Sequence, residues 1–200
     1  MHLLNLDKFT IKDEVIPAER LATMVEADQT KDLSAQLRDD GYLLLRSVYR
    51  PSDVQAARDE ILKRLAEVGE VAEPISDAIS TGTSERRLHY PNTKELGEFW
   101  KSVSEGSALR RVINGPEIIG VMAEIFGEKV THFSFAWLRA MQAGKASPIH
   151  IDHPYMNRGS KELLTCWCPI GPVGLDEGTL YILEGSHTWS DIRAQFEGLD

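Results

Sequence analysis

The sequence PIHIDHP, residues 148–154, decides how the second half of this chain is expected to fold. A proline at each end disfavours a helix, so an extended backbone is predicted between them. In an extended backbone, side chains at i and i+2 project from the same face, which places the imidazole of His150 beside the carboxylate of Asp152. These are two of the three groups of a 2-His-1-carboxylate site, which holds non-haem Fe(II) and leaves positions open for other reactants. The alternative for these residues taken alone is a surface turn in which Asp152 caps a backbone amide.

The residues that follow favour the metal site. LLTCWCPI at 163–170 predicts a buried strand, and DEGTLYILEGSH at 176–187 predicts an acidic-glycine turn leading into another strand. The order and spacing of these elements resemble the phytanoyl-CoA dioxygenase family of Fe(II)/2-oxoglutarate oxygenases, and residues 37–65 are similar to that family's opening segment. The resemblance implies a double-stranded β-helix, which is a cupin-like jelly roll with the metal at its open end.

The composition indicates a globular protein of the cytoplasm. Of the 200 residues, 42% are hydrophobic and 26% are charged, which is ordinary for a soluble domain. The formal charge of −9 disfavours nucleic acid or an anionic membrane as the main partner. The sequence has no run of roughly 18 apolar residues, so no transmembrane helix is predicted. The first ten residues lack a signal-peptide core. Cys166 and Cys168 lie too far apart on one strand for a relaxed disulfide, so reduced thiols are expected.

Helical patterns dominate the first part of the chain. Helices are predicted over residues 18–27, 32–40, 51–65, 99–112 and 116–126. Gly41 is expected to cap the end of the second helix, and Ser52 or Asp53 is expected to be the N-cap of the third. A loop is predicted over 69–83, and strands are predicted at 42–45 and 133–140. Helices followed by strands indicate an α+β fold with helices packed on a sheet. We expect one oxygenase domain, in which residues 1–130 are mainly helical and residues 131–200 form the first part of the jelly-roll core.

The resemblance assigns His150 and Asp152 as iron ligands and as the catalytic residues. A carboxylate at position 152 implies hydroxylation or a related oxidation, because related halogenating enzymes carry a small residue there. His187 is expected to be structural, since the family's Gly-Ser-His histidine ends a middle strand and the third ligand lies on a later one. That third ligand, and an arginine that pairs with 2-oxoglutarate, are expected beyond Asp200. Residues 1–200 are therefore predicted to be incomplete at the C-terminus and to bind iron weakly.

The cosubstrate 2-oxoglutarate needs a cation and hydroxyl groups for its far carboxylate. Arg139 is the preferred cation within this chain, and Arg158 is the second candidate; a surface salt bridge is the alternative for Arg139. Thr165 and Trp167 share one face of their predicted strand, and the resemblance places Trp167 near the cosubstrate.

The residues directly after the His-x-Asp motif are candidates to border a small-molecule substrate. His153 faces opposite to His150 in a regular strand, so it is expected in the pocket wall. Tyr155, Asn157 and Arg158 are expected at the substrate mouth, with core packing as the alternative for Tyr155. Neither the substrate nor the oligomeric state is predicted.

The sequence thus predicts a dioxygenase of the hydroxylase type that uses Fe(II), 2-oxoglutarate and O2 on a small organic substrate. Two alternatives stay open: a non-catalytic jelly-roll binding module with an incomplete metal site, and a cupin-like enzyme that uses another metal without 2-oxoglutarate. A zinc site at Cys166 and Cys168 is disfavoured because there is no second cysteine pair, and both are expected to be small core residues.

Overall fold

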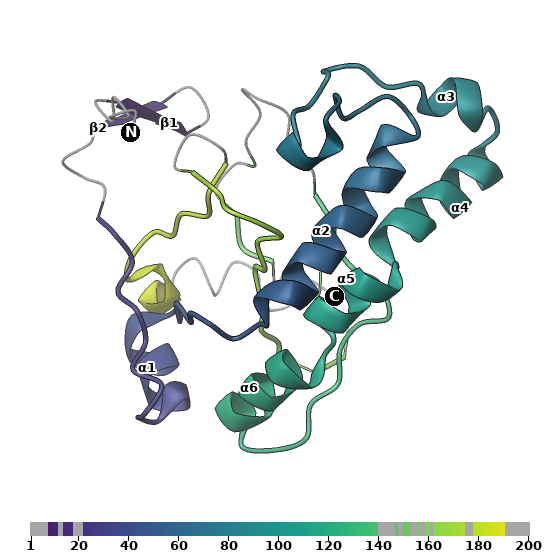
Figure 1. Cartoon of the computed structure of the whole chain (residues 1–200). Coiled ribbons are helices and arrows are strands. Elements are labelled where there is room, and N and C mark those ends of the chain that lie inside the picture. Colours follow the sequence, from purple (N-terminus) through teal and green to yellow (C-terminus); the bar gives the residue numbers. More distant parts are fainter. Residues whose placement is uncertain are drawn as a thin grey trace. The chain divides into compact units, whose positions relative to one another are not determined.

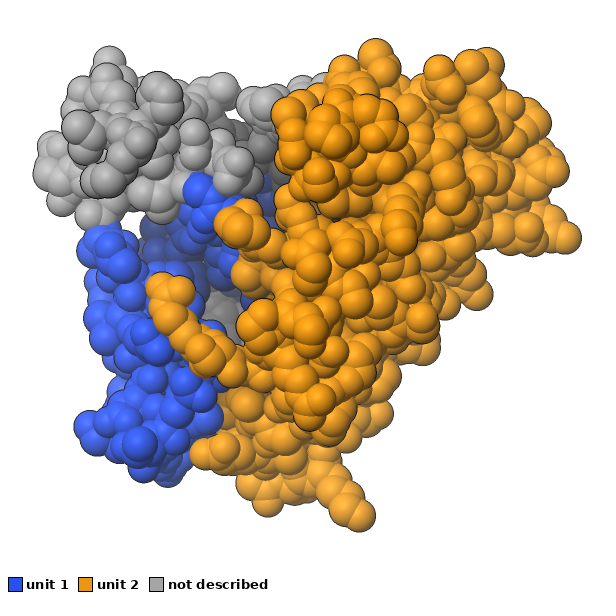
Figure 2. Space-filling model, in the orientation of Figure 1, with its two compact units in different colours: residues 1–45, 143–167, 173–200 blue, residues 46–142, 168–172 orange. Residues whose placement is uncertain are grey.

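The computed structural model describes residues 8–11, 14–17, 22–139, 147, 150–152, 156, 159–160, 162–174 and 178–190 (Figure 1). Contacts within the chain divide it into two compact units (Figure 2). Unit 1 consists of Met1–Leu45, Ala143–Trp167 and Val173–Asp200, and unit 2 consists of Arg46–Gln142 and Cys168–Pro172. Helices α2 to α6 therefore belong to unit 2, whereas the His-x-Asp motif belongs to unit 1.

Unit 2 is built from helices that follow one another closely in the sequence. Helix α2 (Pro51–Ala66) begins at a proline, whose fixed φ suits the first helical position and whose missing N–H is not needed there. Its N-cap is Arg50, which makes no side-chain cap bond, so the prediction of Ser52 or Asp53 as cap was wrong. The remaining helices are the short 3-10 helix η2 (Ile75–Asp77), α3 (Arg86–His89), α4 (Thr93–Ser104), α5 (Ser107–Ile113) and α6 (Pro116–Phe126).

Helices α4 and α5 correct one prediction made from the sequence, and helix α6 confirms another. The single helix expected over 99–112 is divided into α4 and α5, because Gly106 has φ −58° and ψ 148°, outside the helical region. Asn92 caps α4 through a bond from the amide of Glu95 to its side chain. Helix α6 ends as predicted at Gly127, which adopts the left-handed conformation with φ 70°.

The core of unit 2 lies where α2 packs against α4 and α5. Ala57 of α2 is fully buried, and Phe99 of α4 and Leu109 of α5 are each 2% exposed. Burying a large apolar side chain stabilises a fold by roughly 1.5–3 kcal/mol. The buried cluster consists of Ala57, Ile61, Leu65, Val68, Phe99, Val103, Leu109 and Val112.

A carboxylate of α2 caps the N-terminus of α5. Glu60 Oε2 accepts from the amide of Ala108 at 3.2 Å, and Glu60 Oε1 accepts from the amide of Leu109 at 3.3 Å. The first amides of a helix have no partner within that helix, and a negative charge is stabilised at this end. A methyl group added at Gly106 would overlap Glu60 Oε1, so glycine gives the carboxylate room to reach the amides.

An ion cluster ties together the beginnings of α2 and α6. Arg111 of α5 lies 3.2 Å from Asp53 of α2 and donates to both carboxylate oxygens of Glu117 at the first turn of α6. The hydrogen bond from Arg111 is the main cause that lowers the pKa of Glu117 from 4.5 to about 2. The carboxylate form of Glu117 is therefore preferred in the folded state.

Unit 1 contains a hairpin, one α-helix and one short 3-10 helix among its described residues. Strands β1 (Lys8–Ile11) and β2 (Glu14–Pro17) are antiparallel. Helix α1 (Leu33–Asp40) is capped by Asp32 and ends as predicted at Gly41, with φ 79°. The ring of His187, in the 3-10 helix η3 (Ser186–Thr188), lies so close to Gly41 that a methyl group there would overlap it. His187 thus packs against the C-terminal end of α1.

The strands predicted outside this hairpin do not form ladders in the part of the chain that the structure describes. Pairing beyond β1 and β2 is limited to single bridges between Glu26 and Leu44 and between Val71 and Ser80. The first bridge also corrects the helix predicted over 18–27, because the amide of Ala27 donates to the carbonyl of Leu44 and residues 22–27 are not helical. The jelly roll and the single-domain organisation stay predictions.

Gly106→Ala is expected to destabilise the protein by about 1–2 kcal/mol, the usual value of a helix N-cap. The added methyl group displaces Glu60 from the amides of Ala108 and Leu109. The matched control is Gly97→Ala, which lies within α4 in open space and should stabilise by about 0.5–1 kcal/mol. Chemical denaturation measures both, and equal effects of the two substitutions would contradict the proposed cap.

Glu117→Gln is expected to lower the melting temperature at pH 7 but to have little effect near pH 2. The pKa of Glu117 is about 2 in the folded state, against a usual value of 4.5. The stability that its charge contributes is therefore complete above about pH 5 and is lost as the pH falls toward 2. Thermal unfolding monitored by circular dichroism across this range measures the difference.

The control for this prediction is Glu98→Gln on α4, where the carboxylate is 67% exposed and lies 4.0 Å from Lys94. A pair of this kind contributes little to stability. A loss of stability in Glu117→Gln that does not change with pH would show that shape rather than charge matters at this position.

Candidate functional site

His150 and Asp152 lie side by side in unit 1, as their spacing predicted. Nε2 of His150 is 3.4 Å from Oδ1 of Asp152, and the two side chains are 41% and 27% exposed. The two atoms that face each other are an imidazole nitrogen and a carboxylate oxygen, both of which are ligands for first-row metal ions. The pair is therefore accessible to an ion from solvent.

The spacing of this pair fits a metal ion. Two nitrogen or oxygen ligands that each lie about 2.1 Å from an ion, with a right angle between the two bonds, are roughly 3 Å apart. The observed separation of 3.4 Å between His150 Nε2 and Asp152 Oδ1 is close to that value.

Thr165 contacts the other oxygen of the Asp152 carboxylate. Its Oγ1 donates a hydrogen bond to Oδ2 of Asp152 at 2.6 Å. One carboxylate oxygen thus faces His150 while the other is bound by a neighbouring hydroxyl. The predicted role of Thr165 at the cosubstrate stays a prediction.

A third ligand is not found beside this pair. Among the residues that the structure describes, no three His, Cys, Asp or Glu side chains gather closely enough to hold a metal ion. His187 packs against Gly41, in agreement with the structural position expected for it.

The residues predicted to bind cosubstrate do not all belong to the same unit. Trp167 belongs to unit 1 and is 46% exposed. Arg139 belongs to unit 2, where its guanidinium carbon lies 5.0 Å from the centre of the Trp137 ring. His153, Tyr155, Asn157 and Arg158 lie outside the described residues.

Similarity to a known protein family extends over most of the chain. A model of the family described as phytanoyl-CoA dioxygenase (PhyH) matches residues 37–199. The chain belongs to the phytanoyl-CoA dioxygenase family. No curated protein and no solved structure matches it significantly.

Membership of the phytanoyl-CoA dioxygenase family indicates the kind of chemistry. The family in general comprises oxygenases that depend on Fe(II) and 2-oxoglutarate and act on small molecules with O2. The matched range includes His150, Asp152 and Thr165, so the pair described above lies within the part that carries the family's similarity. In the described part of the chain, no helix is long and apolar enough to cross a membrane.

Neither cysteine takes part in a disulfide, and the two lie in different surroundings. Cys166 is exposed, so its prediction as a small core residue was wrong. Cys168 is half-buried in unit 2, where its Sγ lies 2.8 Å from the hydroxyl of Tyr49. Neither belongs to a metal-binding group among the described residues.

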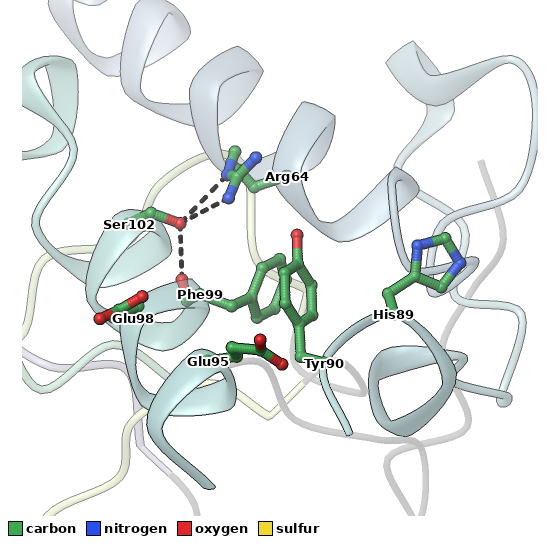
Figure 3. A pocket seen from close by; sticks show the side chains of 7 residues that line it. All are labelled: Arg64, His89, Tyr90, Glu95, Glu98, Phe99 and Ser102. Carbon is green, nitrogen blue, oxygen red and sulfur yellow. Dashed lines mark hydrogen bonds between the residues drawn. The ribbon is translucent and has the colours of Figure 1, made fainter. Parts of the chain in front are cut away.

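Figure 3 shows a pocket of unit 2 that the sequence did not predict. The rings of Tyr90 and Phe99 stack at 4.7 Å, and Arg64 lies 5.3 Å from the Phe99 ring while donating to Ser102 Oγ at 2.7 Å. In the sequence, aromatic residues such as these indicate only a buried core. The pocket depends on how α2 and α4 pack, which the sequence pattern does not give. Its volume is about 390 Å³, and it is lined by Arg64, His89, Tyr90, Glu95, Glu98, Phe99 and Ser102.

Iodoacetamide is expected to alkylate Cys166 several-fold faster than Cys168, because only Cys166 is exposed. Peptide mass spectrometry over a time course measures both rates. Equal rates in the unmodified sequence would contradict the difference in exposure.

Proposed function

We propose that this protein is an Fe(II)- and 2-oxoglutarate-dependent dioxygenase of the hydroxylase type that acts on a small organic substrate. The observation that carries the proposal is the pair formed by His150 Nε2 and Asp152 Oδ1, which are 3.4 Å apart within the range matched by the family. His150 and Asp152 would hold the iron together with a further ligand. The fold that we propose around them is the jelly roll of the family, with helices packed on it.

The residues of the pair suit this role because of their charge and exposure. The Asp152 carboxylate offsets part of the charge of a divalent cation, and the His150 imidazole adds a neutral ligand. Both are partly exposed, so a cosubstrate and a substrate can approach the positions that they leave open. When bound, iron and 2-oxoglutarate supply the oxidation, in which one oxygen atom of O2 enters the substrate and the other enters succinate as CO2 is released.

The sequence identifies the groups that would bind the cosubstrate. We propose that Arg139 pairs with its far carboxylate and that Trp167 forms a wall of its site, since a carboxylate needs a cation and its carbon chain needs an apolar surface. His153, Tyr155, Asn157 and Arg158 would border the substrate. The protein's own contribution is to position these groups and to limit the access of water.

Asp152→Ala tests the metal site directly. The substitution should weaken Fe(II) binding by more than about 100-fold, because even changes to groups that only support a ligand typically cost 10–100-fold. Anaerobic calorimetry of the full-length protein measures the affinity, and release of succinate from 2-oxoglutarate in the presence of O2 is the second readout. His150→Ala should behave in the same way.

The matched control is Asp39→Ala, which removes an exposed carboxylate from α1. It should leave both metal affinity and succinate release unchanged. If Asp152→Ala bound Fe(II) as tightly as the Asp39→Ala control, the metal assignment would have to be abandoned. Binding of 2-oxoglutarate without any succinate release would instead fit a non-catalytic binding module.

A further inference from the structure

The hydrogen bond between Thr165 and Asp152 makes the two oxygens of one carboxylate unequal. Oδ2 accepts a hydrogen bond from Thr165 Oγ1 at 2.6 Å, while Oδ1 lies 3.4 Å from His150 Nε2. A length of 2.6 Å is typical of a hydroxyl that donates to an ionised carboxylate, and such bonds are about twice as strong as those between neutral groups. This bond lies at the surface, and it favours one orientation of the Asp152 carboxylate.

The residue type at position 165 strengthens this constraint. Threonine is branched at Cβ, so its χ1 angle is restricted and its hydroxyl keeps one direction. A hydroxyl carries a single proton, and here that proton is directed to Asp152. The same hydroxyl cannot donate to a cosubstrate carboxylate at the same time.

We infer that Thr165 is a positioning residue that keeps Asp152 bound to the metal through one oxygen only. This inference rests on the function proposed above. A carboxylate can bind an ion through one or both oxygens, and binding through both occupies an additional position. With Oδ2 engaged by Thr165, Oδ1 is the oxygen presented beside His150, and the positions that the chemistry requires stay open. In this role Thr165 acts through Asp152 and does not itself touch the reacting atoms.

Three substitutions in the full chain test the role of Thr165. Thr165→Val keeps the shape of the side chain and removes the donor, so Co(II) affinity should fall by about 10-fold or more, the usual effect of losing a group that supports a ligand. Thr165→Ser keeps the donor and should retain most of the affinity. Thr131→Val is the matched control, because Thr131 is exposed in unit 2, and it should have no effect.

The readout is titration with Co(II), followed by its visible absorption. The intensity and position of the Co(II) bands depend on the number of bound ligands, so a carboxylate that changes from one to two bound oxygens alters the spectrum of Thr165→Val. Circular dichroism and the melting temperature should be the same in all variants, which separates this effect from a loss of folding. A changed spectrum in Thr165→Val, restored in Thr165→Ser, is the expected result.

Two contrary outcomes are distinguishable. If Asp152→Ala abolishes Co(II) binding but Thr165→Val leaves both affinity and spectrum unchanged, the role of Thr165 is disproved and the proposed function stands. If Asp152→Ala and His150→Ala leave Co(II) binding unchanged, the proposed metal site is wrong, and the inference about Thr165 is wrong with it.

Discussion

The packing of helix α2 is the constraint on which the rest of unit 2 depends. Ala57 is fully buried, and its small side chain leaves room for the neighbouring helices to approach closely. From the same helix, Glu60 supplies the first amides of α5 with acceptors, and Arg58 donates to the carbonyl of Ile170 at 3.2 Å. A single helix thus supports both the apolar core and the polar contacts at its edges, so substitutions on it affect several elements together.

Through these contacts α2 also fixes part of the segment that follows the candidate site. Residues 168–172 belong to unit 2 because Ile170 packs against the core and Cys168 lies 2.8 Å from the hydroxyl of Tyr49. Thr165, whose hydroxyl is bound to Asp152, precedes Cys168 by three residues in the sequence. The contacts of Cys168 and Ile170 thus join residues 168–172 to the helical core of unit 2.

The sequence predicted best those features that depend on near neighbours. Gly41 and Gly127 were recognised as helix ends because each adopts a left-handed conformation that glycine tolerates. His150 and Asp152 were expected side by side because two residues of extended backbone suffice to place them there. The division at Gly106 and the bond between Thr165 and Asp152 were missed, since the first depends on Glu60 of another helix and the second joins residues 13 positions apart.

The contrast between helices and predicted strands has the same physical origin. A helix satisfies its backbone hydrogen bonds within itself, so a local pattern can specify it, whereas a strand needs a partner that is often distant in the sequence. In the described chain the buried apolar side chains lie between Leu33 and Ile125, while Phe135, Trp137 and Trp167 in the predicted strands are exposed. Apolar residues that alternate along a strand stabilise a fold only when a second layer covers them. The His150 and Asp152 pair is by contrast a local arrangement, which is why the spacing of the two residues was enough to predict it.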